Sequence, residues 1–91
     1  MARILVVEDE ADLRQVIEFN LAQNGHEVET AGTGTEGLRR ARARRPDLVL
    51  LDIMLPDLTG LEVCRQIKAD ASLHGVAVVL LTARGEQLDR V

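Results

Sequence analysis

ILVVED, at residues 4–9 of this 91-residue chain, is a short aliphatic run that ends in two acidic residues. The pattern returns at residues 48–52, where LVLLD ends in Asp52, and at residues 76–82, where VAVVLLT ends in Thr82. Short continuous runs of this kind are typical of strands that are buried on both faces of a parallel sheet. If the three strands are parallel neighbours, their carboxylates and a hydroxyl converge at one edge of the sheet.

The composition indicates one small globular domain. An apolar fraction of 46% is ordinary for such a domain, and no apolar run approaches the roughly 18 residues of a membrane span. The single cysteine, Cys64, excludes an internal disulfide and fits a reducing compartment, so we expect a cytoplasmic protein without membrane contact. A formal net charge of −4 gives no general attraction to nucleic acid.

Helical patterns alternate with the strands. We expect helices from about residue 10 to 24, from 33 to about 44, and from 59 onwards; the last two begin with the capping-box pattern T-x-x-E. The first helix is expected to bury one aliphatic face and to hold one half-buried amide. These residues are Leu13, Val16, Ile17 and Leu21, with Asn20 as the amide. The arginines at residues 39–45 are best interpreted as a solvated helix surface.

The segment EVETA at residues 27–31 alternates polar and apolar residues, as an edge strand with one wet face does. Strict alternation of strands and helices with right-handed crossovers predicts a doubly wound parallel α/β sheet. With residues 27–31 at the edge, the strand order is 2-1-3-4 along the chain numbering. Ligands of such sheets bind at the carboxyl ends of the strands where the order reverses, between strands 1 and 3. Glu8, Asp9 and Asp52 are expected there.

Three motifs resemble one known family. ILVVEDE at residues 4–10, DIMLPDLTG at 52–60 and LLTARG at 80–85 resemble the receiver domain of two-component response regulators, in the right order and over all 91 residues. The Glu-Asp pair and the segment at residues 83–91 are most similar to the subgroup that carries a winged-helix DNA-binding domain. The resemblance implies a flavodoxin-like fold and a phosphoacceptor signalling domain rather than an enzyme in the ordinary sense.

The resemblance also implies a role for each polar residue at the sheet edge. Asp52 would accept a phosphoryl group from a phosphohistidine of a sensor histidine kinase, with Mg²⁺ or Mn²⁺ offsetting the repulsion between the two anions. Thr82 would donate a hydrogen bond to a phosphoryl oxygen, and Ala83 would present its backbone at the phosphoryl site. The implied metal ligands are Glu8 (through a water molecule), Asp9, Asp52 and the backbone carbonyl of Met54.

One part of the receiver pattern is missing. Receivers carry a lysine at the end of a fifth strand, whereas Lys68, the only lysine, falls near the end of the expected third helix. We therefore expect an incomplete receiver at residues 1–91 that lacks the fifth strand, with residues 85–91 as the start of a fourth helix. DNA contact would belong to an output domain outside this chain.

Without a fifth strand, the segment from Val76 to Leu81 would expose one flat, aliphatic edge. Such edges pair with other chains, so we expect self-association, most simply a two-fold dimer through this edge. The substitution Val78→Lys is expected to shift the chain towards monomer or unfolded chain.

Two alternative functions are weighed against phosphoacceptance. A pseudo-receiver would bind partners without phosphorylation; the missing lysine favours it, and the intact Asp9, Asp52 and Thr82 argue against it. A haloacid-dehalogenase-like phosphatase also uses a strand-end aspartate and Mg²⁺. That family needs a second aspartate two residues after the first, where this chain has Met54.

Overall fold

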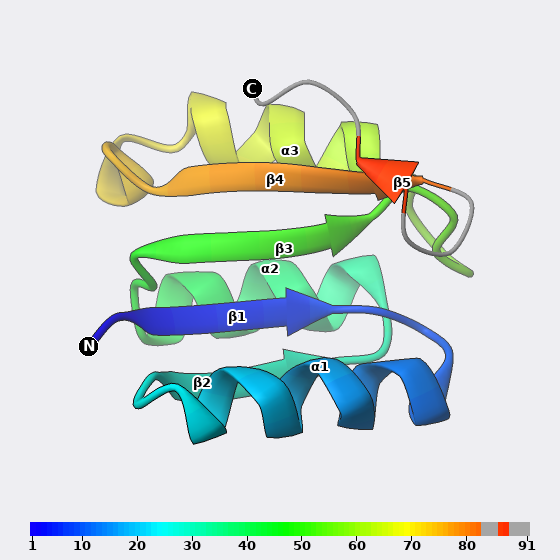
Figure 1. The fold of residues 1–91 in the computed structure, drawn as a ribbon. Coiled ribbons are helices and arrows are strands. Elements are labelled where there is room, and N and C mark those ends of the chain that lie inside the picture. Colours follow the sequence, from blue (N-terminus) through cyan, green and yellow to red (C-terminus); the bar gives the residue numbers. More distant parts are fainter. Residues whose placement is uncertain (83–85, 88–91) are drawn as a thin grey trace.

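A sheet of four parallel strands, with a short antiparallel fifth strand, forms the centre of the computed structural model, which describes residues 1–82 and 86–87 (Figure 1). The strands are β1 (Arg3–Val7), β2 (Glu27–Ala31), β3 (Leu48–Asp52), β4 (Ala77–Thr82) and β5 (Glu86–Gln87). Their order is β2-β1-β3-β4-β5. The predicted doubly wound sheet and its 2-1-3-4 order are therefore confirmed.

The C-terminal end of the described chain differs from the prediction. Glu86 and Gln87 were expected to begin a helix, but they pair antiparallel with Thr82 and Leu81 as β5. The physical reason is that the outer side of β4 offers backbone hydrogen-bond partners, whereas a helix of so few residues is marginal by itself. Gly85 and residues 88–91 of the expected helix lie outside the described residues.

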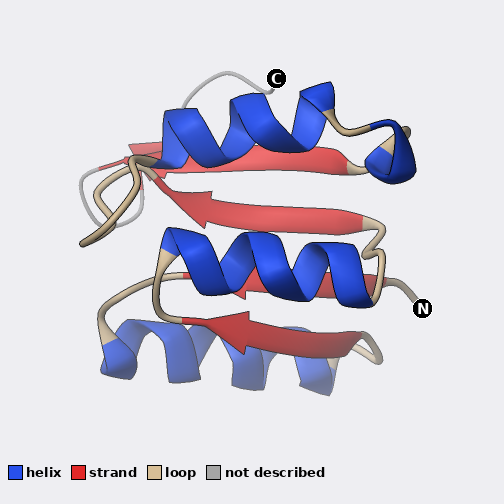
Figure 2. Cartoon of the chain, turned by 180° about the vertical axis from the view of Figure 1, so that it is seen from behind, coloured by secondary structure: helices blue, strands red, loops and turns tan. Residues whose placement is uncertain are grey.

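The helices cover the sheet unequally, as the front and back views show (Figures 1 and 2). One face carries α1 (Ala11–Gln23), and the other carries α2 (Gly34–Ala43) and α3 (Gly60–Ala69). A short 3₁₀ turn, η1 (Ala71–Leu73), follows α3 and was not predicted. The core lies on the two-helix face. Its main members are Leu5, Val7, Leu38, Ala41, Val49, Leu51, Val63, Cys64, Ile67, Val78 and Leu80.

The α1 face is only partly closed. Leu13, Ile17 and Leu21 of α1 are half-buried, but Val16 is 56% exposed and Asn20 is exposed, with its side-chain amide donating to the Val16 carbonyl. The prediction that Val16 and Asn20 lie in the interface is therefore wrong. The helix packs on β1 and β2, and no other helix lies on this face in the part of the chain that the structure describes.

Helix ends follow the predicted signals closely. The side-chain oxygens of Thr33 and Thr59 accept hydrogen bonds from the backbone N–H groups of Glu36 and Glu62, each at 3.1 Å. These bonds satisfy donors that the first turns of α2 and α3 would otherwise leave unpaired. Gly25 ends the turn after α1 in a left-handed conformation with φ of 86°. Of the helices described, none is long and apolar enough to cross a membrane.

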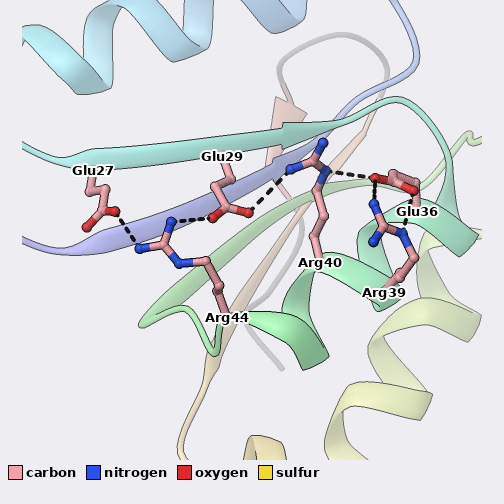
Figure 3. A network of polar contacts seen from close by, with 6 residues as sticks. All are labelled: Glu27, Glu29, Glu36, Arg39, Arg40 and Arg44. Atoms are coloured by element: carbon pink, nitrogen blue, oxygen red, sulfur yellow. Dashed lines mark hydrogen bonds and ion pairs between the residues drawn. The ribbon is translucent and has the colours of Figure 1, made fainter.

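Charged side chains connect the outer strand β2 to α2 (Figure 3). Arg44 bridges Glu27 and Glu29 at 2.7 Å and 3.0 Å, and Arg40 lies between Glu29 at 3.5 Å and Glu36 at 2.8 Å. These arginines lie on a solvated helix surface, as predicted. Exposed ion pairs add little stability, about 0–1 kcal/mol each, but charges along an edge strand discourage pairing with other chains.

The contact between α2 and β1 generates a prediction about Gly37. A Cβ atom at this position would lie 2.9 Å from Cγ2 of Val7, a core side chain that is 1% exposed. Gly37→Ala should therefore lower the free energy of unfolding by about 1–3 kcal/mol. This loss should outweigh the gain of about 1 kcal/mol from better helix propensity. Urea denaturation measures the change.

The matched background is Val7→Ala, which removes the two methyl carbons that a Cβ at residue 37 would meet most closely. In that background Gly37→Ala should be neutral or stabilising. An equal cost in both backgrounds would show that the close approach of α2 to β1 is not what requires glycine.

Candidate metal-binding site

Strand register brings three carboxylates together. In the adjacent parallel strands β1 and β3, Val7 lies opposite Leu51, so Glu8 and Asp52 occupy corresponding positions at the carboxyl edge of the sheet. Asp9 follows directly. Carboxylate oxygens of Glu8, Asp9 and Asp52 all lie within 4.8 Å of one another. The convergence expected from the sequence is therefore present in the structure.

Two of the three carboxylates are buried. Glu8 is 2% exposed and Asp52 is 3% exposed, whereas Asp9 is exposed. Burial raises the pKa of the Glu8 carboxyl above its ordinary value, and the neighbouring negative charges of Asp52 and Asp9 add to this rise. A hydrogen bond of 3.0 Å from the backbone N–H of Glu10 opposes it. Clustered buried carboxylates of this kind are relieved by a bound cation.

Arg14 supports the turn between β1 and α1. Its Nη1 atom donates to the Glu8 carbonyl at 2.7 Å and lies 3.5 Å from the Asp9 carbonyl. The guanidinium thereby holds the backbone that carries two of the acids. Sequence reasoning missed this residue, because nothing but its place in the first turns of α1 indicated it.

The loop after β3 lies tightly against the site. The backbone N–H of Met54 donates to Asp52 Oδ1 at 3.2 Å, which helps to orient the carboxylate. At the end of the loop, the N–H of Gly60 donates to the Ile53 carbonyl at 2.9 Å. A Cβ atom on Gly60 would lie only 2.4 Å from the Asp52 carbonyl oxygen. Glycine at this position therefore lets α3 begin directly beside the Asp52 backbone.

The remaining predicted residues lie as follows. Met54 has its backbone beside Asp52, and its side chain is 68% exposed. Thr82 is the last residue of β4, one position beyond the residue that pairs with Asp52. Ala83 lies outside the described residues. Lys68 lies at the amino ends of the strands, opposite the carboxylates. Its Nζ donates there to the Val76 carbonyl at 3.4 Å, so it does not reach the site.

The donor set fits a hard divalent cation. All three side chains offer carboxylate oxygens, the ligands that Mg²⁺ and related cations prefer. Two of these oxygens come from buried residues whose mutual repulsion a cation would offset. The arrangement can hold a metal ion at the same edge of the sheet that presents the Asp52 carboxylate.

Comparison with known sequences gives consistent relatives. A family model described as the response regulator receiver domain matches residues 4–91. Transcriptional regulatory protein AfsQ1 of Streptomyces coelicolor is 43% identical over 91 residues, all of this chain and 39% of that protein. DNA-binding response regulator MtrA of Mycobacterium tuberculosis is 45% identical over 89 residues, 98% of this chain and 38% of that protein. The chain thus spans under two-fifths of the length of these relatives.

Solved structures share the fold. The N-terminal domain of a response regulator receiver protein from Methanoculleus marisnigri superposes with a TM-score of 0.87 at 38% identity, covering 91% of this chain and 68% of that chain. Response regulator TrrA from Thermotoga maritima, in complex with Mg(2+)-BeF, gives a TM-score of 0.84 at 40% identity over 91% of this chain and 70% of that chain.

The raised pKa of Glu8 predicts how stability depends on pH without a divalent cation. Because folding raises this pKa, the folded state favours the protonated carboxyl, and stability falls as the pH rises through and above 4.5. Glu8→Gln should therefore raise the free energy of unfolding at pH 7. It should also flatten the decline above pH 4.5. Thermal melts from pH 4 to 8 measure both effects.

The control for this prediction is Glu18→Gln, which removes the same charge from an exposed position of α1. This variant should keep the pH profile of the wild type. Parallel profiles for the wild type and Glu8→Gln would show that Glu8 carries no unfavourable charge in the folded protein.

Proposed function

The chain belongs to the response regulator receiver domain family, and we propose that its carboxylate site accepts a phosphoryl group on Asp52 from a sensor histidine kinase. The observation that supports this most directly is the carboxylate cluster itself. Carboxylate oxygens of Glu8, Asp9 and Asp52 lie within 4.8 Å of one another at the carboxyl ends of the adjacent strands β1 and β3. This is the point where the strand order of the doubly wound sheet reverses.

Asp52 is proposed as the nucleophile. In the transfer step an Asp52 oxygen forms a bond to phosphorus, the bond from phosphorus to the donor histidine nitrogen breaks, and that nitrogen keeps the electron pair. The product is an acyl phosphate on Asp52. The Met54 N–H on Oδ1 keeps the carboxylate oriented for attack, so less orientational freedom is lost in the transition state.

Mg²⁺ or Mn²⁺ is the proposed cofactor. When bound, the cation supplies positive charge that offsets the repulsion between a carboxylate and an anionic phosphoryl group. Asp9, Asp52 and the Met54 carbonyl would hold it, with Glu8 acting through a water molecule. Thr82 is proposed to donate to a phosphoryl oxygen, and Ala83 to present its backbone there.

A phosphorylation-incompetent interaction domain is the second candidate function. The placement of Lys68 favours it, because the only lysine of the chain donates to the Val76 carbonyl at the amino ends of the strands, away from the carboxylates. Without a cation from a lysine at the phosphoryl oxygens, transfer to this chain should be slow.

The wider role follows from the relatives. AfsQ1 is a transcriptional regulatory protein and MtrA is a DNA-binding response regulator. We propose that phosphorylation of this domain controls transcription through an output domain outside residues 1–91, in the cytoplasm.

Incubation with a small phosphodonor and Mg²⁺ should add one phosphoryl group to the chain, read as intact mass. Asp52→Ala should abolish the addition, because it removes the attacking oxygen. Asp9→Asn should raise the Mg²⁺ concentration needed for half-maximal labelling by more than about tenfold, since it removes a ligand charge.

The control for phosphorylation is Asp47→Asn, which makes the same chemical change as Asp9→Asn but at the amino ends of the strands. There Asp47 accepts a hydrogen bond from the Arg3 N–H. This variant should label like the wild type. Labelling of Asp52→Ala at the wild-type level would point to another acceptor. An unlabelled wild type that still binds Mg²⁺ would favour the interaction domain.

We also propose that the chain self-associates through the outer edge of β4. In the described residues, β5 pairs only with Leu81 and Thr82, so the backbone from Ala77 to Leu80 has no strand beside it on that side (Figure 1). This segment is aliphatic and carries no charge or proline, the usual protections of an edge strand. A closed two-fold dimer is the simplest arrangement.

Sedimentation should therefore show a dimer or a larger species. Val79→Lys should shift it towards monomer, because Val79 is half-buried on the open α1 face. Val78→Lys, expected from the sequence to give monomer or unfolded chain, does not separate these two outcomes, since Val78 is 1% exposed in the core and a lysine there would unfold the chain. Gln23→Lys, which adds the same charge at an exposed polar position of α1, is the control. A wild type that stays monomeric as its concentration rises would contradict the proposal.

A further inference from the structure

Asp57 connects two loops at the edge of the sheet that carries the site. Its Oδ1 accepts hydrogen bonds from the N–H groups of Gly34 at 2.8 Å and Leu58 at 2.7 Å, and its Oδ2 accepts from Thr35 at 2.9 Å. Gly34 and Thr35 form the start of α2, whereas Asp57 belongs to the loop between β3 and α3. These bonds, here called the Asp57 bridge, join segments more than 20 residues apart in the sequence.

The Asp57 carboxylate at the centre of the bridge carries a negative charge. Hydrogen bonds from Thr35, first from its side chain and then from its backbone, hold the pKa of Asp57 well below its ordinary value of 3.8. The carboxylate also lies at the positive end of the α2 dipole. Asp57 is therefore charged throughout the neutral pH range.

A second observation shows how closely the two loops approach. A Cβ atom on Gly34 would lie 2.9 Å from Cβ of Leu58, 2.9 Å from Cγ2 of Val63 and 3.3 Å from Oδ1 of Asp57. Only glycine allows the first turn of α2 to approach the β3–α3 loop this closely. Side-chain hydrogen bonds and backbone packing thus act at the same point.

The same loop is also fixed beside Asp52. Ile53 donates its N–H to the Leu81 carbonyl at 3.2 Å and accepts from the N–H groups of Leu55 at 3.2 Å and Gly60 at 2.9 Å. Met54, whose carbonyl is a proposed metal ligand, lies between these bonds and the Asp57 bridge. The loop is therefore held on both sides of Met54, by the backbone hydrogen bonds of Ile53 and by the side chain of Asp57. Of these two attachments, only the Asp57 side chain can be removed by substitution.

We propose that Asp57 is a positioning residue for the carboxylate site: by attaching the β3–α3 loop to α2 it fixes the Met54 backbone relative to Asp52 and so sets the affinity for a divalent cation. This inference rests on the proposed function. It differs from a simple capping role, in which Asp57 would stabilise α2 without affecting the site.

Reciprocity gives a second observable. If the bridge raises the affinity for the cation, the cation must stabilise the bridge by the same free energy. Addition of Mg²⁺ should therefore slow hydrogen exchange of the Gly34 and Thr35 amides, which donate to Asp57. A cap without influence on the site would leave both exchange rates unchanged.

The test is Mg²⁺ titration of the 91-residue chain by calorimetry at pH 7. Asp57→Ala should bind Mg²⁺ about fivefold more weakly, somewhat less than the loss usual for residues that orient metal ligands directly. Asp57→Asn should stay within about twofold of the wild type. The amide keeps an oxygen in the place of Oδ1, which accepts two of the three backbone hydrogen bonds. Both variants remove the same charge, so a difference between them measures position rather than electrostatics.

Two further variants guard against loss of folding. Asp70→Ala removes another acidic cap, which accepts from Ser72 at 2.9 Å beyond the far end of α3, and should leave the affinity for Mg²⁺ unchanged. Gly34→Ala disturbs the bridge without changing any charge and should weaken binding as Asp57→Ala does. Circular dichroism confirms that each variant is folded at the titration temperature.

The outcomes separate the two proposals. A wild type that does not bind Mg²⁺ would overturn the proposed function and this inference with it. Wild-type affinity in Asp57→Ala would overturn this inference alone. Equal weakening in Asp57→Ala and Asp57→Asn would also overturn it, because the effect would then be one of charge.

Discussion

The pairing of β1 with β3 is the constraint on which the rest of the structure depends. Val7 and Leu51 lie opposite each other, 1% and 0% exposed, and so the acids that follow each strand meet at the edge of the sheet. Aliphatic packing behind the site thus holds two buried carboxylates together although their charges repel. Fully burying one such aliphatic side chain contributes about 1.5–3 kcal/mol, enough for the core to offset an unfavourable charge pair at its rim.

Two loops complete the site, and three residues hold them by different physical interactions. Arg14 donates to the backbone that carries Glu8 and Asp9. Gly60 brings the start of α3 against the Asp52 backbone, and Asp57 connects the intervening loop to α2. Since none of these three is itself among the proposed ligands, the geometry of the site is distributed over residues that would not touch the cation. Pre-organisation of this kind lowers the free-energy cost of ordering the ligands when a cation binds.

Most of the fold was predictable because its signals are local. Strand and helix bounds follow from apolar periodicity and from the capping threonines, and the strand order follows from the polar alternation of β2. The sequence did not indicate the Asp57 bridge, because its partners are 22 and 23 residues away and no periodic pattern relates them. Nor could it assign Val78 to the core rather than to the open face. In a continuous apolar run both faces look alike, and only the packed helices distinguish them.

The two outer sides of the sheet, at β2 and at β4, differ in how well they are protected against pairing with another chain. At β2, charges of Glu27 and Glu29 are held along the strand by Arg44 and Arg40, so another strand would have to displace ion pairs before it could add there. At β4, the described edge is aliphatic and β5 covers only its last two residues. The weakly covered α1 face adjoins this same edge, so among the described residues exposed apolar surface and unpaired backbone coincide on one side of the molecule. The proposed self-association would bury both features if it used either one, and it would then favour one direction of pairing over random aggregation.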